Sequence, residues 1–385
     1  MRIVHLAITG LLLVADAGTG AAQQAPPRRL TERLATAAHG FTAIGSVAEL
    51  ADGRVAVVDP KDRSVMLFTA NLASFRPVGR RGDGPGEFSG NLGRVFIVGA
   101  DTLLLHDAGN RRFQAFDRDG KPAGTIALPA DPAANSPGVA FSRVAGNRRY
   151  CAQRVVIPPG QAARPDSVPI VCGRFGTSVS PIASIKQPTL TEEVTLGPGD
   201  KMQVLVWGAP EDDWTIASNG DVAIVRSAPY RVEWHPASGD PVIGPPIPWV
   251  AVPVTRADRD ELVAVRRAAQ GTASRGGMQI GGQGMRIAGV LPSDVPPPMT
   301  SHKPPFVLRS LVAGPGRELW IGRHQPHGAL PQYDVVDGSG RVAYQVQLAG
   351  RGSRIVSVTA RHVYVDREDG DGLHHLERWR RPSME

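Results

Sequence analysis

The stretch that decides the fold runs from Gly79 to Asp117. It begins with the glycine-rich GRRGDGPGEF (79–88), passes through the apolar run LLLHD (103–107) and ends with AGNRRFQAFD (108–117). This order predicts a glycine-rich connection, a strand, a polar turn and a second strand that ends in an aromatic residue. Such an order is typical of one β-propeller blade joined to the next. Because one blade cannot bury both of its faces alone, it predicts several more blades packed in a ring.

A second copy of this pattern lies upstream. The segment VVDPKDRSVMLF (57–68) aligns with LHDAGNRRFQAF (105–116), so that Asp59 falls on Asp107 and Phe68 on Phe116, each 48 residues apart. A period of about 40–50 residues is typical of four-stranded propeller blades.

Four further copies complete the predicted ring. They are expected at 139–185, 212–240, 306–348 and 355–379. Residues from Leu30 to about Gly40 are expected to add an outer strand to the last blade, which closes the ring and removes an exposed sheet edge. We therefore expect an all-β fold, a six-bladed β-propeller of four-stranded antiparallel blades, as a single domain over residues 23–385.

One segment, residues 250–305, interrupts the repeat between the fourth and fifth blades. Thr255 is expected to cap a helix, with Asp258 in its first turn and Leu262, Val265 and Ala269 on one apolar face. A glycine-rich stretch (271–289) and a proline-rich stretch (291–305) follow. The segment is either a long connection folded over one rim or a lid over the central channel.

The N-terminus and the charge indicate where the protein is found. Residues 1–22 have one arginine, an apolar run and small residues before Ala22, the pattern of a cleaved signal peptide, which predicts a periplasmic or secreted protein. No later segment is apolar enough to cross a bilayer. The net charge is +7 at pH 7, but the basic residues are dispersed, so we expect no nucleic-acid partner. We expect a monomer.

Cys151 and Cys172 are the two cysteines of the chain, and each lies in a strand-like run. If these runs pair as a hairpin across the turn-forming PPGQAARPDS (158–167), the two residues fall opposite each other. A disulfide there suits an oxidising compartment, and two buried free thiols are the alternative.

On these residues the chain resembles a known group. GDGPGEF followed by VFIVGADTLLLHDAGNRRFQAFDRDG is similar to the NHL-repeat pattern, and the ELWIG (318–322) and KPPF (303–306) stretches resemble exported bacterial six-bladed β-propellers related to NHL repeats. The resemblance implies the fold and a ligand- or protein-binding role. It implies no shared reaction.

Several acidic and histidine residues are candidate metal ligands. The recurring acidic and amide residues predict turn-forming side chains rather than ligands; they are Asp59, Asp62, Asp107, Asn110, Asp366 and Asp369. The acidic loop Asp366–Gly372 resembles a calcium loop but lacks the spacing of an EF-hand. His324 and His327 are expected in a loop. His374 and His375 are expected on opposite faces of a strand, where they cannot easily bind the same ion. No cofactor is predicted, with calcium kept as an alternative.

The sequence carries no convergent catalytic set, so we predict a non-enzymatic propeller that binds a protein partner or a small, possibly anionic ligand at one face of the channel. The candidate ligand-binding residues are Arg81, Asp83, Arg226, Trp320, Arg323 and His324. Arginines at a channel mouth favour anions through bidentate contacts. The alternative is a hydrolase similar to calcium-dependent lactonase propellers. That alternative requires Glu49, Asp107 and Asp366 to converge on the axis.

Overall fold

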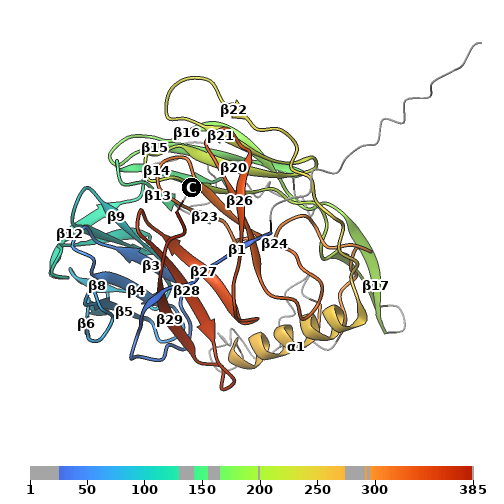
Figure 1. The fold of residues 1–385 in the computed structure, drawn as a ribbon, viewed down its shortest axis with the longest axis horizontal. Coiled ribbons are helices and arrows are strands. Elements are labelled where there is room, and N and C mark those ends of the chain that lie inside the picture. The colour runs from blue at the N-terminus through green and yellow to red at the C-terminus, as the bar shows by residue number, and fades with distance from the viewer. Residues whose placement is uncertain are drawn as a thin grey trace, which may run out of the picture.

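Six antiparallel sheets surround a central axis, so the six-bladed propeller is confirmed (Figure 1). The computed structural model describes residues 26–129, 143–154, 165–197, 200–273, 291–292 and 295–383. The predicted signal peptide and most of the glycine-rich stretch lie outside the described residues. No helix within the described ranges is long and apolar enough to cross a membrane.

Each blade is built from strands that follow one another in the chain. Blade 1 contains β3 (Ser46–Glu49), β4 (Val55–Asp59), β5 (Ser64–Phe68) and β6 (Phe75–Pro77). Blade 2 contains β9 (Leu92–Val98), β10 (Thr102–Asp107), β11 (Arg112–Phe116) and β12 (Pro122–Ala127). Blade 3 contains β13 (Arg143–Val144), β14 (Arg149–Gln153), β15 (Ser167–Arg174) and β16 (Ser180–Lys186).

The second half of the ring has the same order. Blade 4 contains β19 (Asp213–Ile216), β20 (Val222–Ser227), β21 (Tyr230–His235) and β22 (Val242–Ile243). Blade 5 contains β23 (Val312–Ala313), β24 (Leu319–Arg323), β25 (Gln332–Val336) and β26 (Val342–Gln347). Blade 6 contains β27 (Ser353–Val358), β28 (His362–Glu368) and β29 (His374–Arg380), with an outer strand from the N-terminus.

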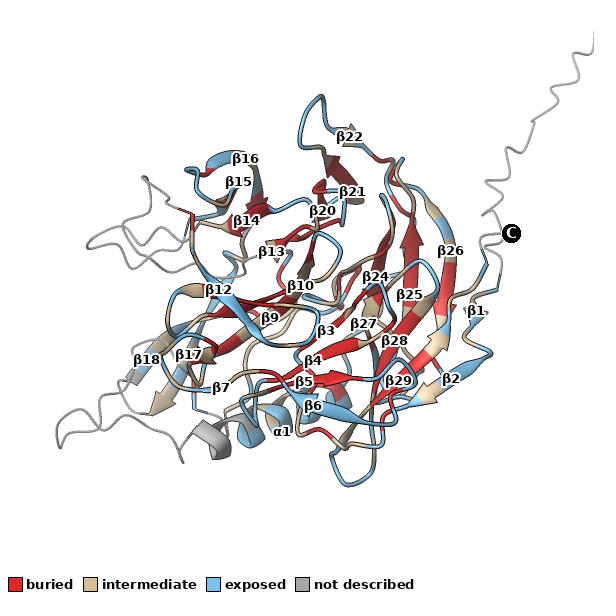
Figure 2. Cartoon of the chain, turned by 90° about the vertical axis from the view of Figure 1, so that its left-hand side faces the viewer, coloured by how far each residue is buried: buried red, intermediate tan, exposed pale blue. Residues whose placement is uncertain are grey.

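The core lies between the blades rather than within any one of them. Six hydrophobic clusters fill the six interfaces between neighbouring blades. Along β4, Val55 and Val57 pack toward blade 6, whereas Ala56 and Val58 pack toward blade 2. Because side chains alternate between the two faces of a strand, a strand buried on both faces is a continuous apolar run. Figure 2 shows such buried strands inside the ring and exposed strands such as β6 at its edge.

The N-terminal segment closes the ring. The strand β2 (Arg33–Thr36) pairs antiparallel with β29, with Arg33 opposite Trp379 and Thr36 opposite Glu377. This pairing confirms the predicted outer strand of the last blade. The sequence did not reveal β1 (Arg28–Arg29), which pairs in parallel with β26 and extends blade 5 to five strands.

Three elements lie between blades. The short strands β7 (Arg80–Arg81) and β8 (Glu87–Phe88) pair within the glycine-rich connection of blades 1 and 2. Gly79 is required there, since its φ is +64° and a Cβ would lie 2.7 Å from the Gly86 carbonyl oxygen. The hairpin of β17 (Thr191–Gly197) and β18 (Asp200–Leu205), which the sequence did not predict, joins blades 3 and 4. The helix α1 (Arg256–Ala273) joins blades 4 and 5.

The repeated aspartates have the structural role that the sequence predicted. The Asp59 carboxylate accepts backbone hydrogen bonds from Thr42, Ala43, Lys61 and Asp62, at 2.9 to 3.1 Å. Asp107 accepts from the backbone of Ser89 at 3.0 Å and from the side chain of Asn110 at 2.9 Å. Each aspartate thus ties the turn of its own blade to the segment that enters the blade.

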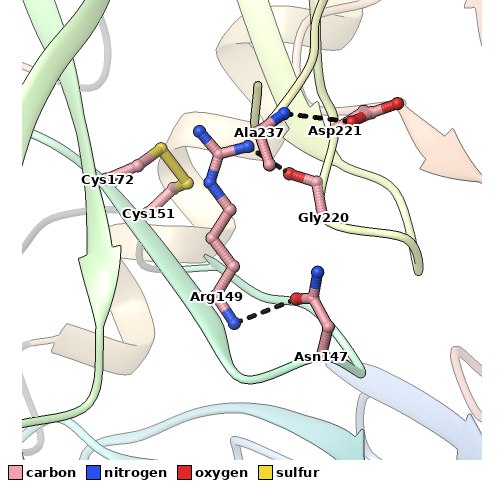
Figure 3. The surroundings of a disulfide bond; sticks show 7 residues. All are labelled: Asn147, Arg149, Cys151, Cys172, Gly220, Asp221 and Ala237. Atoms are coloured by element: carbon pink, nitrogen blue, oxygen red, sulfur yellow. Dashed lines mark hydrogen bonds between the residues drawn. A yellow bond between two sulfur atoms is a disulfide. The ribbon is translucent and has the colours of Figure 1, made fainter. Parts of the chain in front are cut away.

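The predicted disulfide is present. Cys151 on β14 lies directly opposite Cys172 on β15, and the two sulfur atoms are bonded (Figure 3). Next to it, the guanidinium of Arg149 donates to the carbonyl oxygen of Gly220 at 2.6 Å, across the interface with blade 4. The bridge therefore fixes the central hairpin of blade 3 beside an interblade contact.

Replacing both cysteines, as Cys151→Ala with Cys172→Ala, is expected to lower the free energy of unfolding by about 3 kcal/mol. A cross-link between residues of this separation removes about that much conformational entropy from the unfolded chain. Chemical denaturation, compared with the reduced and reoxidised wild-type protein, measures the difference. An unchanged denaturation midpoint in the double variant would show that the bridge does not stabilise the fold.

Candidate functional site

One face of the ring, which we call the mouth face, collects the charged side chains of the channel. In every blade the inner strand comes first and the second strand runs back beside it. The inner strands therefore begin on the same face on which the second strands end. Asp107, which ends β10, and Arg354, which lies at the start of β27, are both on this face.

Charges from several blades converge there on the axis. The charge of Arg94 on β9 interacts with Asp213 on β19 and with Arg354 on β27, which belong to blades 2, 4 and 6. Arg143 on β13 interacts in turn with Arg94, Asp213 and Arg309. Residues of alternate blades meet only at the centre of the ring, so these five side chains surround the inner end of the mouth.

The local structure directs two of these side chains. In β9 the register shifts opposite His106, where Leu105 pairs with Val95 but Asp107 pairs with Leu92. The extra residue makes a β-bulge that includes Arg94, and a bulge changes the direction of the side chains that it carries. Arg309 has a φ of +62°, an uncommon backbone conformation for a residue with a side chain.

Burial and neighbouring charges shift the pKa values of this cluster. Burial and the charge of Arg94 lower the pKa of the Arg143 guanidinium to about 9. Burial also lowers the pKa of Arg94, and the neighbouring Arg354 contributes to this shift. Burial raises the pKa of Asp213, although the backbone N–H groups of Trp214 and Arg309 hydrogen-bond to its carboxylate. Burial is the largest cause of each shift, repulsion between the guanidinium groups adds to it for the arginines, and the Asp213 carboxylate opposes it there.

A cavity of about 260 Å³ opens between blades 5 and 6 beside this cluster. Three arginines from separate segments line it, namely Arg309, Arg323 and Arg354. Ser310, Gln332 and Ser353 add hydroxyl and amide groups to the wall. We call this cavity the arginine pocket.

Buried carboxylates position two of its arginines. Arg354 pairs with Asp366, directly opposite on β28, with a nitrogen–oxygen distance of 2.8 Å. The guanidinium of Arg323 lies 3.5 Å from the carboxylate of Asp334. That carboxylate also accepts hydrogen bonds from Tyr230 at 2.9 Å and from Gln345 at 2.7 Å. The Asp334 carboxylate thus orients Arg323 and also accepts hydrogen bonds from Tyr230 and Gln345.

A second and larger cavity, of about 500 Å³, adjoins the first. Its wall is formed by the β18 strand, helix α1 and the segments that precede blades 4 and 5, with His324 from the loop after β24, and it is mostly apolar. Val307 and Leu308 line both cavities. We call the larger one the helix cavity.

The N-terminus of helix α1 has the Thr255 cap that the sequence predicted. The Asp258 carboxylate accepts from the Thr255 backbone N–H at 2.8 Å, and the Thr255 hydroxyl oxygen accepts from the Asp258 N–H at 3.3 Å. This reciprocal pair is a capping box with aspartate in place of glutamate. The predicted apolar face was wrong at Val265, whose side chain is 59% exposed. Leu262, a member of the predicted face, lines the helix cavity together with Arg266, which was not predicted there.

His324 lies in the wall of the helix cavity. Its ring is 5.9 Å from that of Trp207, edge to face. Burial and the charge of Lys303 lower the pKa of His324 to about 4. The imidazole is therefore neutral at pH 7, and its ring nitrogens make no hydrogen bond to another described residue.

The other predicted ligand residues lie elsewhere. Arg81 and Asp83 are exposed in the glycine-rich connection, and neither lines the two cavities. Arg226 is paired with Asp212 at 2.9 Å and with Glu233 at 2.7 Å. Trp320 is fully buried, and its indole N–H donates to Glu318 at 2.6 Å. Of the six candidates, the structure places Arg323 in the arginine pocket and His324 in the helix cavity.

The acidic set required by the lactonase alternative does not assemble. Glu49 ends the inner strand β3 and therefore lies on the face opposite Asp107 and Asp366. Its carboxylate is 3.0 Å from His362 and accepts a hydrogen bond from Thr359. The condition that the lactonase alternative requires is therefore not met.

Two other clusters contain acidic side chains that could bind a cation. In the acidic loop, Asp369 accepts the backbone N–H groups of Asp371 and Leu373, both at 3.0 Å, as a turn-forming residue does. Within the part of the chain that the structure describes, Asp258, Glu261 and His327 have ligand atoms within 4.8 Å of one another. There the ammonium of Lys303, 2.5 Å from Asp258, already supplies the positive charge. We assign a metal to neither place.

The sequence reasoning missed the arginines that surround the axis. A usable signal was present, because Arg94 precedes Asp107 by 13 residues and Arg354 precedes Asp366 by 12. Ser46 precedes Asp59 by 13 residues, the same spacing as that of Arg94 and Asp107. A position counted back from the repeated aspartate therefore identifies the start of an inner strand.

Comparisons with known proteins support the fold. No protein-family model and no curated protein matches the sequence. Among solved structures, an exported protein of Bacteroides fragilis matches with 10% identity over 91% of this chain and 94% of its own, at a TM-score of 0.50. A streptogramin B lyase (8% identity, 91% and 87% coverage, TM-score 0.40) and a calcium-binding regucalcin of Agrobacterium tumefaciens (11%, 92% and 96%, 0.43) also match. These structures are β-propellers, and at such identities the likeness concerns the fold alone.

The protein is expected to lose stability as the pH falls from about 6.5 to about 4. Burial lowers the pKa of both His324 and His106 to about 4, whereas an unfolded histidine titrates near 6.5. In that window the unfolded chain binds protons that the folded protein does not, so protonation favours unfolding. NMR titration of the histidine Cε1–H signals measures the two pKa values. Titration of both residues near 6.5 would contradict this assignment.

Proposed function

We propose that the protein is an exported, non-enzymatic propeller that binds a small anionic ligand in the arginine pocket. The observation that supports this most strongly is the presence of three guanidinium groups, from three separate segments, around one cavity of about 260 Å³. Guanidinium groups form paired, charge-assisted hydrogen bonds with carboxylate and phosphate oxygens.

The surroundings strengthen the preference for an anion. Arg94 and Arg143 extend the positive charge toward the axis, and Asp213 is the acidic residue that interacts with both of them. A concave site lined by one sign of charge raises the local concentration of ligands of the opposite sign. The small volume suits one anionic group, such as a carboxylate or a phosphate, rather than a whole large ligand.

The lining of the pocket favours binding over chemistry. A guanidinium group offers N–H donors and no acceptor, so these arginines are suited to holding an anion rather than to accepting a proton. The hydroxyl of Ser310 is hydrogen-bonded to the backbone, since it donates to the Val307 carbonyl oxygen and accepts from the Gly322 N–H at 3.0 Å. Export is supported by the disulfide, because such bonds persist in oxidising compartments.

Isothermal titration of the mature protein with inorganic phosphate, sulfate and citrate at low ionic strength tests this proposal. We expect saturable binding that Arg323→Gln weakens by about tenfold or more, because a hydrogen bond to a charged group contributes about 1.5–3 kcal/mol. The matched control is Arg81→Gln, which removes an exposed arginine outside both cavities and should leave the affinity unchanged.

The control also separates specific from diffuse binding. Equal weakening by Arg323→Gln and Arg81→Gln would show a response to net charge only, and the proposal would fail. Absence of saturable binding to all three anions would have the same consequence. Thermal melting of both variants verifies that they are folded.

A further inference from the structure

We propose that the ligand is an amphiphilic anion, whose charged group occupies the arginine pocket and whose hydrocarbon part fills the helix cavity. This inference rests on the proposed function and specifies the class of ligand. It follows from the contact between two cavities of opposite character, one cationic and one apolar.

The two cavities are neighbours across a short segment. Val307 and Leu308 line both of them, and their side chains are 36% and 39% exposed. Their backbone continues directly into Arg309 of the arginine pocket. A molecule that passes over these two residues therefore reaches from the guanidinium groups into the apolar cavity without crossing the core of a blade.

The helix cavity is suited to a hydrocarbon group. Its volume of about 500 Å³ is within the range of small-molecule sites, and its wall includes Val204, Leu205, Leu262 and Phe306. Removing such an apolar surface from water is favourable by about 0.8 kcal/mol for each CH₂ group that becomes buried.

The polar groups of the helix cavity argue against a second anionic group there. The guanidinium of Arg266 is held by backbone carbonyls, with distances of 2.6 Å to Leu291 and 2.8 Å to Val295. His324 is neutral and can exchange one hydrogen bond with a hydroxyl or carbonyl group of the ligand. The negative charge of the ligand therefore belongs in the arginine pocket.

A homologous series of alkyl phosphates tests this arrangement. Inorganic phosphate, butyl, hexyl and octyl phosphate are titrated into the mature protein by calorimetry, each below its micelle concentration. We expect the affinity to rise along the series by up to about fourfold for each added CH₂ group. Octyl glucoside, which has the same chain but no charge, is expected to bind far more weakly than octyl phosphate.

Two variants on the same helix locate the chain. Leu262→Gln is expected to remove the dependence on chain length while leaving the affinity for inorganic phosphate unchanged. The control Val265→Gln alters a neighbouring, exposed position that does not line the cavity and should change neither property. Arg323→Gln should weaken the binding of every phosphate in the series.

The outcomes distinguish this inference from the proposed function. Failure of inorganic phosphate to bind would overturn the proposed function and this inference with it. Phosphate binding that does not depend on chain length would overturn this inference alone. Tight binding of octyl glucoside, insensitive to Arg323→Gln, would also overturn it, because the cavity would then act without the arginines.

Discussion

The pairing of β2 with β29 closes the ring, and the geometry of the mouth face depends on this closure. The two strands come from the beginning and the end of the described chain, and side chains reinforce the backbone pairing. Arg33 donates to Glu377 at 3.1 Å, and Arg380 donates to Glu32 at 2.9 Å. Without this pairing β29 would have an unpaired edge, and no shared strand would link blade 6 to the segment that enters blade 1. Closure therefore holds Arg354 of blade 6 near the charged residues of the other blades.

A closed ring also explains how the protein tolerates crowded cations. The charges at the axis are carried by inner strands whose other residues are fixed in the interblade clusters, as Val95 is beside Arg94. These clusters supply the favourable free energy of folding, while repulsion among the guanidinium groups opposes it. The repulsion is retained because the strands cannot move apart. The guanidinium groups therefore keep their positions around the axis.

The fold could be predicted from the sequence because the propeller repeats one local pattern. Asp59 and Asp107 occupy equivalent turns, and the apolar runs beside them are buried on both faces. The disulfide followed from the same reasoning, since pairing about a turn places Cys151 opposite Cys172. Elements outside the repeat, such as the β17–β18 hairpin, carry no such periodic signal.

The site was only partly predictable. Arg323 is the last residue of β24 and His324 follows it directly, so their place on the mouth face could be deduced from the strand. The neighbours of Arg309 could not be deduced, because its position depends on the connection through α1 and on its backbone hydrogen bond to Asp213. Trp320 illustrates the opposite error, since an aromatic residue on an inner part of a blade packs in the core more readily than it contacts a ligand.

The measurement that tests the central claim most directly is anomalous diffraction from crystals of the mature protein, grown without phosphate or sulfate and soaked in selenate. The account predicts a selenium peak between Arg309, Arg323 and Arg354, and its loss in crystals of Arg323→Gln. Peaks confined to exposed arginines such as Arg81, with none in the arginine pocket, would contradict the account.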